Sequence, residues 1–523
     1  MRVTRSLASI AASLALLALG PAEPAWAGGF RDGVRDALGP RFEAAPELDA
    51  ARAHRSARRG SDAKAQILRW NQIAIDASGL DHTPPGPGDT HVFGQQLGPG
   101  RASRAMAIVH IAIFDAVNAI AGGYRSYTGL SGAPQGASME AAIAQAAHDT
   151  LVALFPAQSA SFDAALGEDL DQVPARKRRD QENGIRLGRR AAAAILALRS
   201  DDGSQHEEPL VGIDHTTSDE PGMWRQDPIS QIPLALGAYW GGVTPFVLRS
   251  VERFRAPEPP AIGSEEYAIA FDEVQRLGGD VTHTPTERSE DQTFAGIFWA
   301  YDGRPSLCAP PRLYNQIAVQ IAEQRGLGTP VEVARMLALV NTAMAEAGIV
   351  IWESKYFYGY WRPVTGIREA DEGTGPTGQG DGNPGTTGDP DFWPLGAPAS
   401  NPAGPNFAPN FTPPFPAYPS GHAGFGGALF QTLRRFYGSD EIPFTFVSDE
   451  FNGETLDNLG DLRPLIPRSF ESLSEAEEEN GQSRIYLGIH WSFDKTEGIA
   501  QGRRVADAVF RNAFVPVSRG GSR

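Results

Sequence analysis

The amino-acid sequence predicts a mostly α-helical protein built from helix bundles, and we expect two four-helix bundles with few or no strands. Apolar residues recur at three- and four-residue steps through long stretches of the chain, which is the spacing of one helix face. The alternation typical of strands is scarce, and glycine and proline gather between the helical stretches. Helices with one apolar face are stable when they bury it against one another, so a bundle is the expected architecture.

Eight stretches carry this helical pattern, and a ninth follows a proline-rich segment near the C-terminal end. In chain order they are Gln66–Ser78, Ser103–Ile120, Glu140–Phe155, Arg176–Leu198, Ser264–Leu277, Pro285–Tyr301, Arg312–Arg325, Pro330–Tyr360 and Ala423–Tyr437. The segment Asp371–Pro390 interrupts the series, because half of its residues are glycine or proline. A segment this polar and flexible does not pack a core, so we expect it at the surface.

The composition narrows the classes of function. The chain has 523 residues, with 46 Lys and Arg against 63 Asp and Glu, so its net charge is −17. That balance argues against a nucleic-acid partner, because affinity for nucleic acid depends on basic surface. The single cysteine, Cys308, excludes an intramolecular disulfide and an all-cysteine metal site.

The N-terminus has the pattern of an export signal. Arg2 and Arg5 precede the apolar stretch Leu7–Leu19, and Ala25-Trp26-Ala27 has the small-x-small pattern of a cleavage site. We therefore expect an exported protein, periplasmic or secreted. The alternative is a membrane anchor, for which this stretch is short.

The signal sets the first of three expected regions. These are a signal peptide at 1–27, an N-terminal helical bundle region at 28–280, and a C-terminal helical bundle with the functional site at 281–523. No stretch after the signal has 18 uninterrupted apolar residues. We therefore expect no stable membrane insertion after signal cleavage.

The first chemically informative segment runs from Lys355 to Pro363. On one helix, a seven-residue step would place Lys355 and Arg362 on the same face, about 10 Å apart along the axis. Pro363 disfavours helix at Arg362 and is expected to end it there. An anion between the two cations would offset the cost of burying them. The alternative is that each cation reaches water or stacks on an aromatic ring.

The second segment is Pro413–His422, directly before the ninth helical stretch. Ser420 can cap that helix, and Gly421 allows a ligand to approach the backbone closely. The first N–H groups of a helix bind anions, and His422 would stand beside such an anion. The alternative is an ordinary serine cap with an incidental histidine.

The third segment is Ser483–Asp494, which contributes a cation, a histidine and a carboxylate. Arg484 is the cation, and Asp494 follows His490 by four residues. Asp494-x-x-Glu497 could also form a capping box, and a carboxylate in that role can still orient a histidine ring. Arg484 could equally belong to a surface ion pair of little energetic value.

Together the three segments supply what a tetrahedral oxyanion needs. Three cations hold its charge, neutral donors hold its oxygens, and the two histidines can carry acid–base or covalent chemistry. In that order, Lys-x6-Arg-Pro, Pro-Ser-Gly-His and Ser-Arg-x5-His-x3-Asp resemble the superfamily of vanadium-dependent haloperoxidases and type-2 phosphatidic acid phosphatases. The resemblance covers about Thr284–Asp494. Within the superfamily the chain looks most like the vanadium chloroperoxidases, through Phe298–Gly303, Pro310–Gln316, Ala338–Asn341 and Phe415–His422.

The resemblance implies a role for each residue of the site. His490 would bind vanadium, and Asp494 would orient His490. Vanadate oxygens would be held by Lys355, Arg362, Ser420, Gly421 and Arg484, with Asp302 paired to Arg484. His422 would take a proton from hydrogen peroxide, and Lys355 would polarise the same peroxide. Trp352 and Phe415 would line the halide side, where family members restricted to bromide often carry histidine in place of this phenylalanine.

The resemblance therefore implies a vanadate cofactor and a peroxidase that oxidises chloride or bromide with hydrogen peroxide to hypohalous acid. A small organic halogen acceptor would be a further partner. The alternative within the superfamily is a soluble exported acid phosphatase that forms a phosphohistidine at His490. A third class is a noncatalytic oxyanion-binding protein, which needs neither histidine.

Overall fold

The computed structural model describes residues 62–83, 92–172, 177–281, 283–301, 309–326, 328–396, 412–454, 462 and 464–517. The helices are α4 Ala63–Asp81, α5 Gly98–Ala121, α6 Met139–Leu154, α7 Ser159–Asp171, α8 Arg178–Arg199, α9 Glu265–Leu277, α10 Glu290–Phe298, α11 Pro311–Gln324, α12 Pro330–Tyr358, α13 Pro363–Arg368, α14 Gly421–Tyr437, α15 Leu473–Tyr486 and α16 Ser492–Asn512. The strands are β1 Phe444–Asn452 and β2 Leu465–Phe470, which pair antiparallel. The predicted signal peptide, residues 1–27, lies outside the described residues.

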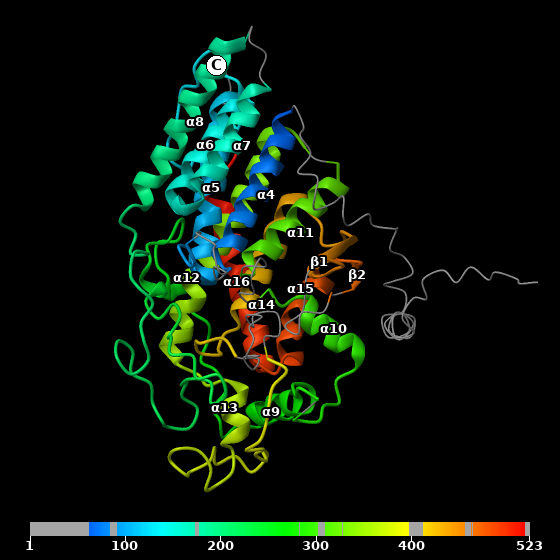
Figure 1. The fold of residues 1–523 in the computed structure, drawn as a ribbon. Coiled ribbons are helices and arrows are strands. Elements are labelled where there is room, and N and C mark those ends of the chain that lie inside the picture. The colour runs from blue at the N-terminus through cyan, green and yellow to red at the C-terminus, as the bar shows by residue number, and fades with distance from the viewer. Residues whose placement is uncertain are drawn as a thin grey trace, which may run out of the picture.

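The prediction of a mostly α-helical bundle protein is confirmed. One bundle consists of α4, α5, α6 and α8, and the other of α12, α14, α15 and α16, with α5 packed along α12 between them (Figure 1). The largest apolar cluster among the described residues runs through both bundles, from Ala63 to Phe514. The predicted division near residue 280 stays a prediction.

Helix α12 is the central element of the fold. It is apolar on nearly every side, and 22 of its 29 residues are buried. By length and composition both α5 and α12 could cross a membrane, but 83% and 100% of their apolar windows are buried inside the protein. Burial on all faces explains their composition, because a helix enclosed by others has no polar face.

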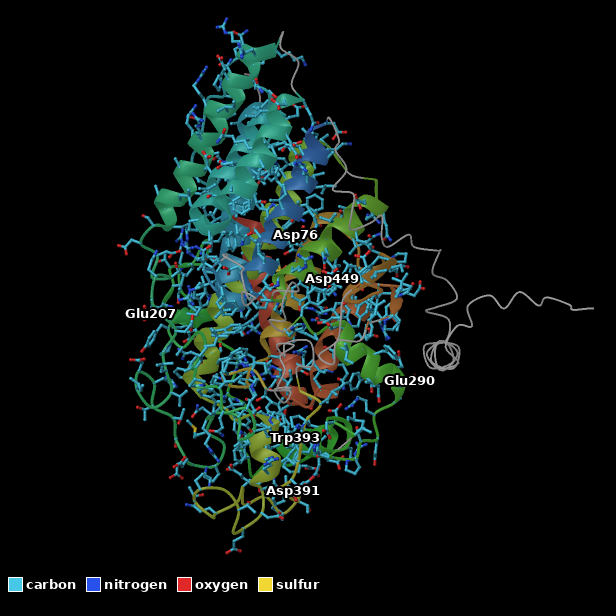
Figure 2. All side chains as sticks on the ribbon, in the orientation of Figure 1. Asp76, Glu207, Glu290, Asp391, Trp393 and Asp449 are labelled. Atoms are coloured by element: carbon cyan, nitrogen blue, oxygen red, sulfur yellow. The ribbon has the colours of Figure 1, made fainter. Side chains whose placement is uncertain are left out.

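The N-terminal and C-terminal parts are also tied together by charge. The Arg312 guanidinium on α11 donates from Nε to Asp449 of β1 at 2.9 Å, and from Nη1 to Asp76 of α4 at 2.8 Å. Figure 2 labels both carboxylates, near the middle of the molecule. Because Arg312 and its two partners come from three elements, this network ties α4 and β1 to α11.

The predicted surface position of Asp371–Pro390 agrees with the structure. This segment has no helix or strand, and five of its glycines have positive φ: Gly373, Gly375, Gly378, Gly380 and Gly382. It leaves the body after α13 at the end of the molecule away from α6 and α8 (Figure 1). Asp381, whose N–H donates to Ala370, ties it back to the residues after α13.

Glycine brings α14 and α16 close together. A Cβ at Gly502 of α16 would lie 2.1 Å from the carbonyl oxygen of Gly424 on α14, and a Cβ at Gly498 would lie 2.6 Å from the carbonyl oxygen of Ser420. Only hydrogen fits at these two positions. This close approach matters for the site, because α14 begins at Gly421 and α16 begins just after His490.

We predict that Gly502→Ala destabilises the protein, since the added methyl group meets backbone that cannot move alone. Overpacking of this kind lowers the free energy of unfolding by about 1–3 kcal/mol. Gly167→Ala is the matched control, because a Cβ at this α7 position meets nothing within 4 Å. Alanine is a better helix former than glycine, so the free energy of unfolding of the control should rise by up to about 1 kcal/mol. Thermal and denaturant unfolding would measure both, and equal stability of the two variants would contradict the packing argument.

Candidate active site

Four helix ends meet at one place in the C-terminal bundle. Ser420 caps α14, and its Oγ accepts the N–H of Ala423 at 3.3 Å, which confirms the predicted cap. The Ser420 N–H donates to the carbonyl of Asp494 at 2.9 Å and so joins the starts of α14 and α16. Lys355 lies in the last turn of α12 and Arg484 in the last turn of α15. Gly421 and His422 are the first residues of α14, where backbone N–H groups have no intrahelical acceptor and can bind an anion.

His490 is held in one tautomer by its neighbours. Nδ1 donates to Asp494 Oδ2 at 2.8 Å, and Nε2 lies 3.1 Å from Nη1 of Arg362, which donates to it. The lone pair of Nε2 is therefore directed toward the cationic side of the junction. A histidine oriented in this way by a carboxylate is suited to bind a metal or attack phosphorus.

The alternative of a capping box between Asp494 and Glu497 is not what the structure shows. Helix α16 begins at Ser492, so Asp494 lies inside its first turn, and its Oδ2 accepts the N–H of Trp491 at 3.0 Å. The same oxygen therefore serves the helix start and the His490 ring.

The prediction that Lys355 and Arg362 share one helix face is also wrong. Helix α12 ends at Tyr358, because Gly359 takes the left-handed conformation with φ of 59°, and Arg362 then caps α13. The chain turns back, so both cations still reach the junction. Lys355 Nζ donates to the carbonyls of Pro416 and Ala417 at 2.8 and 2.9 Å.

Backbone carbonyls hold Arg362 in the same way. Its Nε donates to the carbonyl of Phe415 at 2.9 Å, and its Nη1 donates to the carbonyl of Ile489 at 2.7 Å. The segment 415–417 thus anchors both Lys355 and Arg362. Carbonyl partners carry no full negative charge, so the positive charge of the two side chains remains available to an anion.

His422 is fixed from two sides. Its Nε2 donates to the carbonyl of Trp299, and its own carbonyl accepts the hydroxyl of Tyr314 at 2.8 Å. With the proton on Nε2, Nδ1 carries the lone pair, which is the form that a general base requires. Trp299 and Tyr314 were not predicted as site residues. In both contacts the acceptor is a main-chain carbonyl, and the amino-acid sequence does not show which group a carbonyl will meet.

Burial acts against the charged forms of Lys355 and of the two histidines. It lowers the pKa of Lys355 well below its ordinary value, and the charge of Arg362 lowers it further. Burial likewise lowers the pKa of His490, with Arg362, Lys355 and Arg484 adding to the effect. The pKa of His422 is also lowered, first by burial and then by Arg484.

The carboxyl at the same place shifts in the opposite sense. Burial raises the pKa of Asp494 to about 7, although the Trp491 N–H and the charges of Lys355 and Arg362 oppose the rise. The lowered pKa values of Lys355 and the histidines and the raised pKa of Asp494 share burial as their largest cause. The junction is therefore shielded from water, and it carries positive charge. An anion bound there would reverse the penalty on the cations.

The junction opens into a largely apolar cavity of about 190 Å³. Its polar end is formed by Gly421, His422, Arg484 and His490. The other lining residues are His82, Leu97, Gly98, Pro99, Ile232, Leu234, Leu236, Ala309, Pro310, Trp352, Pro413, Pro414, Phe415 and Phe425. No residue of the segment Asp371–Pro390 lines this cavity.

The structure thus gathers nearly all the predicted site residues. Lys355, Arg362, Ser420 and Asp494 lie behind the cavity wall, each at most 1% exposed. Trp352 and Phe415 pack together in the wall, with ring centroids 4.9 Å apart. Asp302 lies outside the described residues. The apolar wall residues before residue 237 were not predicted, since isolated leucines and isoleucines in loops carry no recognisable pattern.

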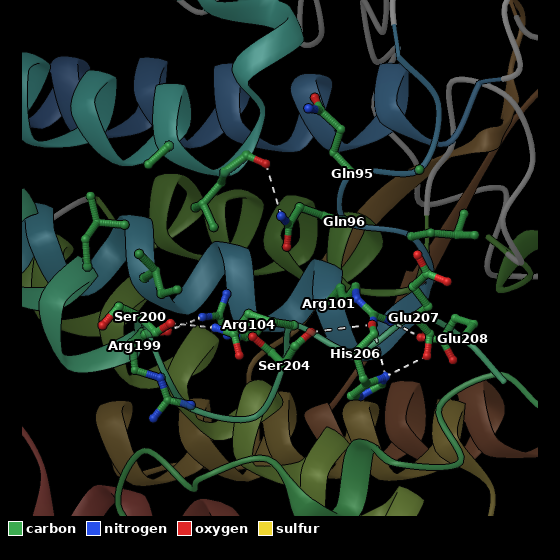
Figure 3. A pocket seen from close by; sticks show the side chains of 17 residues that line it. Gln95, Gln96, Arg101, Arg104, Arg199, Ser200, Ser204, His206, Glu207 and Glu208 are labelled. Atoms are coloured by element: carbon green, nitrogen blue, oxygen red, sulfur yellow. Dashed lines mark hydrogen bonds and ion pairs between the residues drawn. The ribbon is translucent and has the colours of Figure 1, made fainter.

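A larger cavity of about 620 Å³ lies beside the N-terminal bundle, and Figure 3 shows it from close by. Its arginines already have acidic partners. Arg104 Nε pairs with Asp202 at 2.7 Å, Arg199 pairs with the same carboxylate, and Arg101 pairs with Glu208. The charges here are balanced, whereas those at the junction of α12, α14 and α16 favour an anion.

Comparison with known proteins assigns the family. Residues 335–518 match the model of the VCPO second helical-bundle domain. The chain is 31% identical to vanadium chloroperoxidase from Curvularia inaequalis over 509 residues, which covers 82% of this chain and 78% of the relative. The protein belongs to the vanadium-dependent haloperoxidase family. Members of this family are peroxidases that use hydrogen peroxide and halides, and the homologues imply a vanadate cofactor.

Solved structures of haloperoxidases share the fold. A bacterial vanadium-dependent iodoperoxidase is similar with a TM-score of 0.65, at 22% identity, over 86% of this chain and 98% of that chain. An apo-type bacterial vanadium-dependent chloroperoxidase is similar with a TM-score of 0.57, at 17% identity, over 80% and 94%. At these identities the likeness concerns the fold alone.

The residues at the junction fit vanadate. One neutral nitrogen, Nε2 of His490, has its lone pair directed to the place where the cations converge. Donors for oxyanion oxygens surround it, and the start of α14 adds backbone N–H groups. A single protein bond to vanadium with several hydrogen bonds to its oxygens is what this donor set can provide.

We predict that Asp494→Asn weakens orthovanadate binding, because an amide no longer selects the His490 tautomer in which Nε2 is unprotonated and can bind a metal. Losing the partner of a metal-binding histidine typically costs about 10–100-fold in affinity. Asp507→Asn on the same helix is the control, since Asp507 pairs with Arg435 at the surface. Titration calorimetry with orthovanadate would measure both, and equal affinities would argue that Asp494 serves only the helix start.

Proposed function

We propose that this protein is a vanadium-dependent haloperoxidase that oxidises chloride and bromide with hydrogen peroxide to hypohalous acid. The reaction X⁻ + H₂O₂ + H⁺ → HOX + H₂O balances in atoms and charge. The observation that carries the proposal is the arrangement of His490 with Asp494 behind it, beside Arg362 and among the charges of Lys355 and Arg484. Family membership favours this reaction over the phosphatase alternative.

In this proposal the residues of the site have distinct tasks. His490 Nε2 holds vanadium, and Asp494 keeps the ring in the required tautomer. The vanadate oxygens are held by Lys355, Arg362, Ser420, Gly421 and Arg484. Bound vanadate supplies a Lewis acid that makes peroxide susceptible to attack by halide. His422, anchored through Nε2 to Trp299, accepts the peroxide proton at Nδ1.

The apolar wall supports the choice of halide. Phe415 lies against Trp352, and its ring centroid is 5.0 Å from Nζ of Lys355 and 4.9 Å from the guanidinium of Arg362. An aromatic wall beside the cations keeps water away and strengthens their effect on a bound anion. Chloride is harder to oxidise than bromide, so its oxidation depends more strongly on a site that excludes water.

The proposal extends to partners and location. A small organic molecule would accept the halogen from hypohalous acid, and the cavity wall gives it apolar surface to approach. The N-terminal signal pattern supports export to the periplasm or beyond.

We predict that His490→Ala abolishes vanadate retention, whereas His422→Ala keeps the metal and loses most turnover. Only His490 is assigned a bond to vanadium, while His422 moves protons. Vanadium content after gel filtration and bromide oxidation with peroxide would be measured on the same samples. Equal vanadium loss in both variants would refute these roles. Phosphatase activity assayed in parallel separates the alternative, which predicts hydrolysis of phosphomonoesters without vanadate.

We also predict that the wild type oxidises chloride as well as bromide, and that Phe415→His reduces chloride turnover more than bromide turnover. A polar ring would bring water or a hydrogen bond to the cations and weaken the dry wall. Comparing kcat/KM for both halides at one pH decides the matter. Bromide oxidation without chloride oxidation in the wild type would contradict the chloride assignment and leave the haloperoxidase proposal intact.

A further inference from the structure

One wall of the site cavity comes from a distant part of the chain. The segment 232–238 lies between α8 and α9 in sequence and has no helix or strand. Its residues Ile232, Leu234 and Leu236 line the same cavity as the two histidines and Arg484. A segment without regular structure keeps a fixed position only if other groups hold it.

Helix α12 holds this segment through a single carbonyl. The oxygen of Leu236 accepts two hydrogen bonds, one from Trp352 Nε1 at 3.1 Å and one from the Tyr356 hydroxyl at 3.0 Å. Trp352 and Tyr356 are one helical turn apart, so both donors come from the same face. The Leu236 N–H in turn donates to the carbonyl of Pro414 at 2.9 Å, beside Phe415.

A carboxylate holds the next peptide. Gly237 N–H donates to Glu208 Oε2 at 2.5 Å, and the other carboxylate oxygen of Glu208 pairs with Arg101 of α5. Figure 3 shows Arg101 and Glu208 side by side at the edge of the larger cavity. The side chains of Arg101 and Glu208 are 13% and 12% exposed, so this pair is largely shielded from solvent.

The Trp352 indole transmits the position of this segment to the anion site. A Cβ at Gly237 would lie 2.3 Å from Trp352 Cδ1, and one at Gly421 would lie 3.1 Å from the far edge of the same ring. The indole is therefore enclosed between the backbone of the segment and the first residue of α14. A shift of the segment would loosen the indole and admit water beside Gly421.

We propose that Tyr356 and Glu208 are positioning residues that set halide selectivity by holding 232–238 over the site. The inference rests on the proposed function. Halides differ in how strongly they hold water and in how easily they are oxidised, and chloride is the most demanding of chloride, bromide and iodide. A wall that stays closed favours chloride, and a wall that loosens penalises chloride most and iodide least.

Tyr356→Phe tests the proposal, because it removes only the hydroxyl that donates to Leu236. We expect the ratio of kcat/KM for chloride to that for iodide to fall roughly fivefold, the size of one lost hydrogen bond. Tyr358→Phe is the matched control: its hydroxyl lies on the same helix end but donates to the carbonyl of Ala256 at 2.8 Å. The control should keep the wild-type ratio.

Glu208 provides a second variant pair. Glu208→Gln keeps an acceptor oxygen for the Gly237 N–H and should retain the halide ratio, whereas Glu208→Ala removes the acceptor and should lower it. A purely structural role would lower turnover of every halide together and leave the ratio unchanged. That outcome in Tyr356→Phe or Glu208→Ala would overturn the assignment.

Hydrogen exchange of the metal-free protein gives a readout that needs no activity. Peptides covering 232–238 should exchange roughly fivefold faster in Tyr356→Phe than in the wild type or Tyr358→Phe. Unchanged exchange would overturn the positioning role itself. If the wild type with orthovanadate oxidises no halide, the proposed function and the selectivity assignment both fail, while the exchange result still decides whether Tyr356 holds the segment.

Discussion

Three cations buried around one histidine are the constraint on which the rest of this structure depends. Lys355, Arg362 and Arg484 are each at most 1% exposed, and all three act on the pKa of His490. Bringing like charges together in a dry place is costly unless an anion joins them. The fold supports that arrangement by fixing Lys355 and Arg362 through backbone carbonyls, which orient the donors without neutralising them.

The close contact of α14 with α16 follows from this constraint. Glycines on both helices remove the side chains that would separate them, so the cap of α14 and the histidine before α16 meet at one point. The hydrogen bond from the Ser420 N–H to the carbonyl of Asp494 joins the two helix starts directly. Donors from four helices therefore face one small volume, and no single helix could have supplied them.

The N-terminal part of the chain has a role in the same site. Its bundle packs along α12, and its loops deliver His82, Leu97 and the segment 232–238 to the cavity wall. The anion chemistry lies in the C-terminal bundle, while much of the apolar surface around it comes from the N-terminal part. The residues that would hold an oxyanion and most of those that exclude water therefore come from different parts of the chain, and Trp352 contacts both sets.

The helical class, the boundaries of most long helices and nearly all residues of the anion site can be predicted from the sequence alone. Helical periodicity and helix-capping chemistry are local, so they can be seen without coordinates. Some elements carried no such signal: α15 has four glutamates and little apolar periodicity, and α13 has only six residues, the first of which is a proline. The sequence does not show that α12 ends before Gly359, that the Trp299 carbonyl accepts a hydrogen bond from His422, or that Leu236 lines the cavity. These features depend on main-chain groups brought together across more than 100 residues of sequence, or on one glycine conformation, and packing rather than side-chain identity sets them.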